Sequence, residues 1–174
     1  MNKKTLITLA ASILLAVPLF AGSQDNKTQT TDLYEISFPH SWITDTSKVM
    51  GTDLILFSPL VGKNDVFREN VNILVQDLSA YDLSLDQYVD ISVNQINTLI
   101  TDSKIELNER VKGINGDFYK IIYTGKQGKL NLKFEQYFWL VKKTAYVLTF
   151  TCEVDQFSKY QQVGEQILNS FKLK

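Results

Sequence analysis

The stretch that decides the fold is residues 130–152, which read LNLKFEQYFWLVKKTAYVLTFTC. At its start, apolar residues alternate with polar ones, which is the pattern of a strand with one face in water. Residues 137–141 are then apolar on both sides, and residues 145–152 are as well, apart from threonines. A strand that changes from one dry face to two runs beneath a second covering layer. The stretch therefore predicts two neighbouring strands at the centre of a sheet that is covered on both faces.

More strands are predicted outside this pair. Each is an alternating or short apolar run bounded by residues that favour turns. These strands cover residues 33–38, 54–57, 71–76, 104–111 and 118–124, and a polar loop is expected at 60–70.

An amphipathic helix is predicted over residues 84–102. Ser84 begins it, because Gln87 three residues later completes a capping box. Its apolar residues, from Leu85 to Leu99 and Ile100, fall on one stripe at spacings near three and four. We expect this stripe to cover a flat surface.

A second helix follows the last strand. Asp155 is its expected N-cap, and Gly164 lies inside it. Glycine within a helix costs about 1 kcal/mol against alanine, so its presence predicts close approach to the sheet. Together the elements predict an α+β fold, a three-layer α/β/α sandwich. Its central sheet is expected to be mainly antiparallel with six to seven strands, in the chain order βββαββββα.

The composition narrows the classes of function. The 174 residues are 44% hydrophobic and carry 18 basic and 19 acidic side chains, which fits neither a disordered tail nor a basic nucleic-acid-binding protein. Single copies of Cys and His exclude an internal disulfide and the usual tetrahedral zinc sites. We therefore expect no cofactor, no metal and no nucleic-acid partner.

The first 21 residues have the order of a secretory signal peptide. Lys3 and Lys4 precede an apolar run over residues 6–20, and Ala21 is the expected cleavage position. An uncleaved anchor is the alternative, but the run is shorter than the roughly 17 to 25 residues that span a bilayer. The protein is expected to be exported, either periplasmic or secreted, with no stable membrane insertion after cleavage.

The mature chain divides into two parts. Residues 22–32 contain no large apolar side chain and are predicted to form a flexible linker. Residues 33–174 carry all the strand and helix signals and are predicted to form one domain.

No catalytic arrangement stands out. His40 is the sole histidine, and its neighbour Ser41 is a poor partner because residues adjacent in sequence seldom form a base and nucleophile pair. Cys152 ends an apolar strand and is expected to be a buried, inert thiol. We expect no enzyme and no catalytic, cofactor-binding or metal-binding residue. A hydrolase would need His40 about 3 Å from a hydroxyl or thiol and from a carboxylate.

One group of acidic residues is an alternative candidate site. It lies in the two loops that flank the strand at 54–57, where its members have a chance to converge in space. The group consists of Asp45, Asp53, Asp65 and Glu69.

Both ends of the domain resemble a known superfamily. Residues 34–42, YEISFPHSW, are similar to the start of PsbP-like and DcrB-like domains, in which a strand is followed by Pro and, shortly after, Trp. Residues 145–151, AYVLTFT, and the ending ILNSF at 167–171 resemble their closing strand and helix. The resemblance spans about residues 33 to 172 and implies a three-layer sandwich.

The resemblance also implies an accessory or binding protein rather than an enzyme. The superfamily includes an extrinsic subunit of photosystem II, a nuclear transport factor that binds a small GTPase, and bacterial envelope proteins. The bacterial branch fits the predicted signal peptide best.

Two functions of different classes stay open. The first is an exported, non-catalytic accessory domain that engages another envelope or extracellular protein through loops 39–53 and 59–70. Trp42, His40 and Tyr81 are the candidate interface residues, because all three are expected in loops or turns. The alternative is a small-molecule or lipid carrier with a cleft between the sheet and the helix at 84–102. A closed apolar pocket of about 300 Å³ or more would indicate the carrier. The identity of the partner and the oligomeric state stay open.

Overall fold

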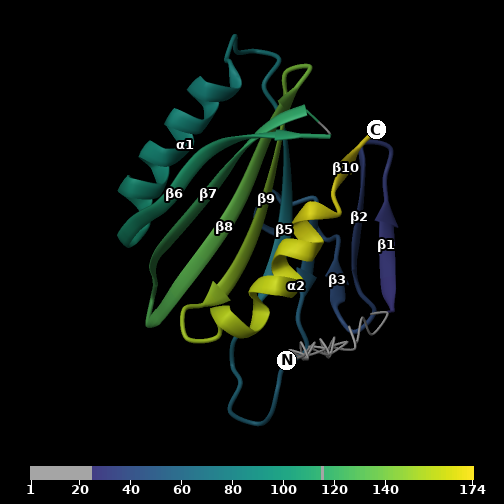
Figure 1. Ribbon diagram of the computed structural model, residues 1–174, viewed down its shortest axis with the longest axis vertical. Helices are drawn as coiled ribbons and strands as arrows, with labels where there is room; N and C mark the ends of the chain where they lie inside the picture. Colours follow the sequence, from purple (N-terminus) through teal and green to yellow (C-terminus); the bar gives the residue numbers. More distant parts are fainter. Residues whose placement is uncertain (1–24, 115) are drawn as a thin grey trace, which may run out of the picture.

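The computed structural model describes residues 25–114 and 116–174, so the predicted signal peptide at 1–21 lies outside the described residues. Figure 1 shows a large twisted sheet flanked by helices, and the predicted α+β three-layer sandwich is confirmed. The helices are α1 (Leu85–Leu99), α2 (Phe157–Asn169) and a 3₁₀ turn, η1 (Val49–Gly51). The strands are β1 (Asn26–Thr30), β2 (Tyr34–Pro39), β3 (Ile43–Asp45), β4 (Leu54–Phe57), β5 (Asn70–Asp77), β6 (Thr101–Gly113), β7 (Gly116–Gln127), β8 (Leu130–Val141), β9 (Thr144–Glu153) and β10 (Lys172–Leu173).

The main sheet has seven antiparallel strands in the order β3-β4-β5-β9-β8-β7-β6. Burial along β8 alternates at first and then extends to both faces, and β9 is buried over eight consecutive residues. The two strands predicted at the centre of a covered sheet are therefore confirmed there. β3 forms one edge of this sheet, in a segment where the sequence predicted only a loop.

The strand predicted at 33–38 does not join the main sheet. It is β2, which forms a second, three-stranded sheet with β1 and β10. β1 corrects the flexible linker predicted at 22–32, because residues 26–30 pair with β2 along their length. The Thr28 and Ser37 hydroxyls lie 2.9 Å apart, and Lys27 Nζ donates to the Trp42 carbonyl at 3.0 Å. Pairing with an apolar neighbour thus orders a strand that has no apolar side chains of its own.

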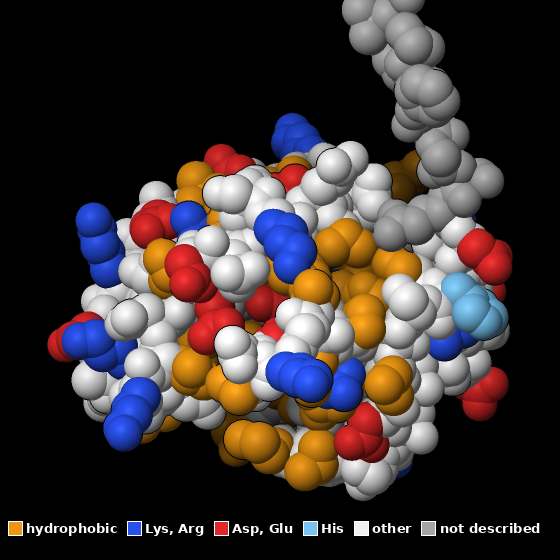
Figure 2. All heavy atoms as spheres, turned by 90° about the horizontal axis from the view of Figure 1, so that it is seen from below, with side chains coloured by type: hydrophobic (Ala, Val, Ile, Leu, Met, Phe, Trp, Pro, Cys, Tyr) orange, Lys and Arg blue, Asp and Glu red, His pale blue; other side chains and the backbone are white. Residues whose placement is uncertain are grey.

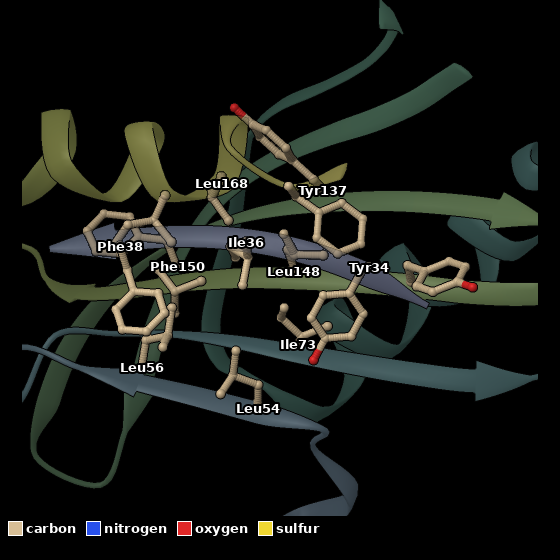
Figure 3. Close-up of a cluster of buried hydrophobic side chains, with 14 of the residues drawn as sticks. Tyr34, Ile36, Phe38, Leu54, Leu56, Ile73, Tyr137, Leu148, Phe150 and Leu168 are labelled. Carbon is tan, nitrogen blue, oxygen red and sulfur yellow. The ribbon is translucent and has the colours of Figure 1, made fainter. Parts of the chain in front are cut away.

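Each face of the main sheet has its own core. On one face, α2 and the small sheet cover β4, β5, β8 and β9. Figure 3 shows Phe38 of β2 above Leu56 of β4, with Phe150 of β9 beside them. On the other face, the core is formed by buried residues of α1 and of the strands beneath it, such as Tyr88 and Ile121.

The start of α1 is as predicted and its end is not. Ser84 Oγ accepts from the Gln87 backbone N–H at 3.2 Å, and Gln87 Oε1 accepts from the Ser84 N–H at 2.8 Å, so the capping box is confirmed. The helix ends at Leu99 rather than at residue 102, because β6 begins at Thr101.

α2 also begins one residue later than predicted. Its N-cap is Gln156 instead of Asp155, and no side chain closes the cap. The prediction for Gly164 is confirmed: a Cβ at this position would lie 2.6 Å from the Phe150 ring. Only glycine allows α2 to pack this closely on β9.

Candidate functional site

The helix α1 covers only part of its face of the sheet. Beside its C-terminal end, β4, β5, β9 and β8 form the floor of an open groove of about 720 Å³. A hollow of about 230 Å³ runs from this groove along α1 and shares Leu74, Ile100 and Val147 with it. The groove lies beside the end of the helix, where the predicted cleft between the sheet and residues 84–102 is partly realised.

Strand pairing places polar side chains in the middle of the groove floor. Asn72 of β5 is opposite Thr149 of β9, which is opposite Gln136 of β8. Gln136 Nε2 donates to Thr149 Oγ1 at 2.9 Å, whereas the described residues offer the Asn72 side chain no hydrogen bond. Asn70 and Thr151 form a second polar pair in the next row. The floor therefore presents amides and hydroxyls to an occupant.

Apolar side chains close both ends of these rows. On β4, Ile55 and Phe57 lie opposite Asn72 and Asn70. At the other end, Phe134 of β8 stacks on Tyr123 of β7 with the ring centroids 4.6 Å apart. The groove is thus a polar strip between apolar flanks.

The two banks of the groove carry exposed apolar side chains. Leu99, at the end of α1, is 75% exposed, and Met50 of η1 is 90% exposed. We expected Leu99 to be covered as part of the helix stripe. It is not, because the helix ends over the uncovered part of the sheet.

The bank at η1 is held in an unusual backbone conformation. Lys48, Met50 and Gly51 all have positive φ angles, of 60°, 54° and 78°. A left-handed conformation is uncommon for side chains such as Lys and Met, and such conformations cluster at functional sites. In this conformation Met50 is exposed at the edge of the groove.

The groove can bind but offers little for catalysis. Its lining has no carboxylate, histidine or thiol, and Lys126 is its one charged side chain among the described residues. A hydroxyl such as that of Thr149 has no neighbouring base in the groove that could activate it. Apolar contact and hydrogen bonding are therefore its available chemistry.

Two members of the predicted acidic group do meet. Asp65 and Glu69 line a separate hollow of about 220 Å³ with Glu153. Figure 2, which views the molecule from below Figure 1, shows acidic side chains gathered near apolar ones on the lower end of the molecule. Partial burial, together with Asp155 and the other two carboxylates, raises the pKa of Glu153. Within residues 25–114 and 116–174, no group of three or more His, Cys, Asp or Glu residues is arranged to hold a metal ion.

The prediction of a buried Cys152 is confirmed. The residue has no exposed surface, and its Sγ lies 3.9 Å from Glu69 Oε1. Burial and then the nearby Glu69 carboxylate raise the pKa of this thiol far above its usual range. His40 is exposed, and its side chain forms no hydrogen bond or ion pair with the described residues. The arrangement required for a hydrolase is not formed around His40.

The three candidate interface residues lie in different environments. Trp42 is only 3% exposed and packs in the core with α2, which corrects its expected place at the surface. Trp42 comes three residues after the end of β2, and its indole packs in the same apolar core as the buried side chains of that strand. His40 and Tyr81 are exposed, and their role in contact stays a prediction. Neither of them lines the groove.

Sequence reasoning missed the residues that form the groove. Asn72, Thr149 and Gln136 occupy polar positions in otherwise apolar strands, and that break in pattern was the available signal. The loops at 39–53 and 59–70 do carry exposed apolar side chains, as the prediction of a contact patch requires. These are Ile43, Val49, Met50, Leu60, Val61 and Val66.

In the part of the chain that the structure describes, no helix is long and apolar enough to cross a membrane. No family model matches the sequence, and no curated protein matches it.

Solved structures do match the fold. Cyanobacterial PsbP (CyanoP) from Synechocystis sp. PCC 6803 is similar, with a TM-score of 0.63 and 14% identity, over 92% of this chain and 99% of that one. A Pseudomonas aeruginosa protein of unknown function has a TM-score of 0.60 and 13% identity, over 83% and 94%. LpqN of Mycobacterium tuberculosis, involved in cell envelope biogenesis, has a TM-score of 0.58 and 7% identity, over 88% and 87%. The chain therefore has the PsbP-like fold, as its two ends predicted.

Proposed function

We propose that this protein is an exported, non-catalytic accessory domain that binds a segment of another envelope or extracellular protein in the groove beside α1. The observation that carries the proposal is the open groove with exposed Met50 and Leu99 on its banks. Exposed apolar side chains gathered at a concave surface are typical of protein contact sites. LpqN, a structure with the same fold, has a described role in the cell envelope, which supports the proposed setting.

The chemistry of the groove suits a peptide segment. Apolar side chains of a partner would pack on the flanks, against residues such as Phe57 and Phe134. The backbone of the same segment would exchange hydrogen bonds with Asn72 and Gln136, because amides both donate and accept. Thr149, between them, completes a polar strip that runs across three strands.

A small-molecule or lipid carrier remains the second candidate. The volume of about 720 Å³ lies within the roughly 300 to 1,000 Å³ of ligand pockets, which favours a carrier. The open shape favours a peptide, because ligand pockets bury most of their ligand and Met50 and Leu99 leave this groove accessible.

The proposal is tested by affinity capture with matched variants. The full chain would be immobilised and exposed to its own envelope fraction, and bound material would be identified by mass spectrometry. Met50→Asp should weaken capture of the partner protein at least about tenfold, because it places a charge on an apolar bank. Asp tolerates the left-handed backbone at this position. Ile114→Asp is the matched control, since Ile114 is fully exposed and lies outside the groove and outside both loops of the predicted contact patch.

A second pair of variants lies on α1 itself. Leu99→Asp should also weaken capture, whereas Ile91→Asp should not, because Ile91 is exposed on the same helix but does not line the groove. Equal capture by all four variants would contradict the assignment of the groove. Recovery of a lipid or metabolite in place of any protein would favour the carrier.

A further inference from the structure

The groove floor contains a threonine hydroxyl that has no partner. Thr151 of β9 is 8% exposed and lines the groove. Its side chain forms no hydrogen bond with the described residues. Among these residues, the fully enclosed polar atoms without a partner belong to Glu135 and Trp139, so the Thr151 hydroxyl retains accessible surface. A ligand in the groove can therefore reach this hydroxyl.

The alternation of β9 places Thr151 on the groove side of the sheet. Successive side chains of a strand point to opposite faces. Val147 and Thr149, at the two preceding alternate positions, also line the groove. Phe150 and Cys152, on either side of Thr151, belong to the core on the opposite face. Thr151 is thus part of the groove floor and not of the core beneath α2.

An amide oxygen lies next to this hydroxyl on the neighbouring strand. Asn70 of β5 is directly opposite Thr151. The Asn70 Nδ2 donates to the Arg68 carbonyl at 3.1 Å, which fixes the orientation of the amide and leaves Oδ1 without a hydrogen bond from the described residues. Directly opposite residues of an antiparallel pair have their Cβ atoms about 4.5 to 5.5 Å apart. One side chain of a partner can therefore contact both residues.

This pair of residues favours a neutral group that both donates and accepts hydrogen bonds. The Thr151 hydroxyl can donate, whereas Asn70 Oδ1 can only accept. A carboxamide suits both, because its oxygen accepts from the hydroxyl while its NH₂ group donates to the amide oxygen. A carboxylate has no donor for Asn70 Oδ1. An ammonium group has donors, but it would lose its hydration in a lining that contains no carboxylate.

We propose that the segment bound in the groove inserts an Asn or Gln side chain between Thr151 and Asn70, and that these two residues select this side chain over apolar and charged ones. The inference rests on the proposed function, since it specifies a side chain of the segment that occupies the groove. Phe57 lies opposite Asn70 and Phe134 lies opposite Thr151, so apolar surface flanks the inserted amide on both sides.

Selection of random peptides displayed on phage, with the full chain as target, tests this inference. Peptides that bind wild-type protein but not Met50→Asp bind in the groove, and they should share an Asn or Gln at one position. A synthetic copy of the strongest binder is then compared with a copy in which Leu replaces that residue. Calorimetric titration should show about threefold to tenfold weaker binding of the Leu peptide, which is the range expected from one net hydrogen bond.

The variant Thr151→Val removes the hydroxyl and keeps the shape of the side chain. It should weaken binding of the amide peptide about threefold to tenfold and change binding of the Leu peptide by less than about twofold. Thr124→Val is the matched control on β7, because Thr124 does not line the groove. The melting temperature of Thr151→Val should not fall, because the hydroxyl has no partner within the protein to lose.

The outcomes separate this inference from the proposed function. Groove-binding peptides that share no amide residue, or an amide peptide that binds Thr151→Val as tightly as wild type, would overturn the inference and leave the proposed function in place. A lower melting temperature of Thr151→Val would also overturn it, because the hydroxyl would then stabilise the fold. Recovery of no peptide that depends on Met50 would overturn both.

Discussion

The two faces of the main sheet are built from the same seven strands but are covered differently. On the α2 face, the helix and the small sheet together bury large side chains such as Phe150 and Tyr34 almost completely. On the α1 face, a single helix covers part of the sheet, and Asn72 and Gln136 occupy positions that it leaves open. The extent to which helices and the small sheet cover each face therefore decides which face contributes most to stability and which face is available for binding.

Phenylalanines of the two faces should differ most in their contribution to stability. Phe150→Ala should lower the free energy of unfolding by about 3 to 5 kcal/mol, because Phe150 is fully buried between β9 and α2. Phe57→Ala should lower it by only about 1 kcal/mol, because Phe57 is half-buried at the groove. Urea denaturation followed by circular dichroism measures both values. Similar losses for the two variants would mean that the α1 face stabilises the fold as strongly as the α2 face.

A glycine on each face extends the comparison. Gly164→Ala should destabilise by about 1 to 2 kcal/mol, because the added methyl meets the buried Phe150 ring and overpacking outweighs the gain in helix propensity. Gly125→Ala on β7 would clash with Ile100, but Ile100 is only partly buried beside the groove and has room to move. We expect a smaller loss, below about 1 kcal/mol. Thermal melts of both variants, with the exposed Ser158→Ala as control on α2, would show the order.

Local patterns were sufficient for most of the α2 face. Most buried residues of β8 and β9 are apolar, apart from Glu135 and the threonines of β9, and Gly164 marked the close contact of α2. Such features depend on neighbouring residues and on burial, and both leave periodic signals in sequence.

Features set by distant neighbours were not predictable. β1 is polar and is ordered by its pairing with β2. Trp42 is buried because the chain after β2 stays against the same apolar core. The groove exists because α1 leaves part of its face of the sheet uncovered, and no periodicity in the sequence records where a helix lies across a sheet. Leu99 shows this directly, since it belongs to the apolar stripe and is nevertheless exposed.

High pH offers a further probe of the α2 face. The Tyr34 hydroxyl donates to Asp53 Oδ2 at 2.6 Å, and burial and then this carboxylate raise the pKa of Tyr34 well above 10. The folded protein therefore keeps this proton at a pH where the unfolded chain loses it. Its contribution is complete below pH 10 and is lost as pH rises further, so stability should fall above pH 10.

The variant Tyr34→Phe isolates this group. At pH 7 it should lower the free energy of unfolding by about 1 kcal/mol through the lost hydrogen bond. Above pH 10 the difference from wild type should shrink, because phenylalanine has no proton to lose. Urea denaturation at pH 7, 9 and 10.5 measures this, and a constant difference across the series would show that Tyr34 does not contribute to the alkaline loss.

The smallest effect should come from the groove floor, and it should have the opposite sign. Asn72→Val replaces a polar side chain, for which the described residues provide no hydrogen bond, with a β-branched one that suits a strand between Ile55 and Thr149. Stability should rise by up to about 0.5 kcal/mol, while capture of the partner should weaken. Asn108→Val on the exposed edge strand β6 is the control and should leave capture unchanged. A residue that lowers stability but is needed for binding is expected on the face that functions, since natural proteins give up some stability at such sites. If Asn72→Val is destabilising and keeps full capture, the polar floor belongs to the fold rather than to the site.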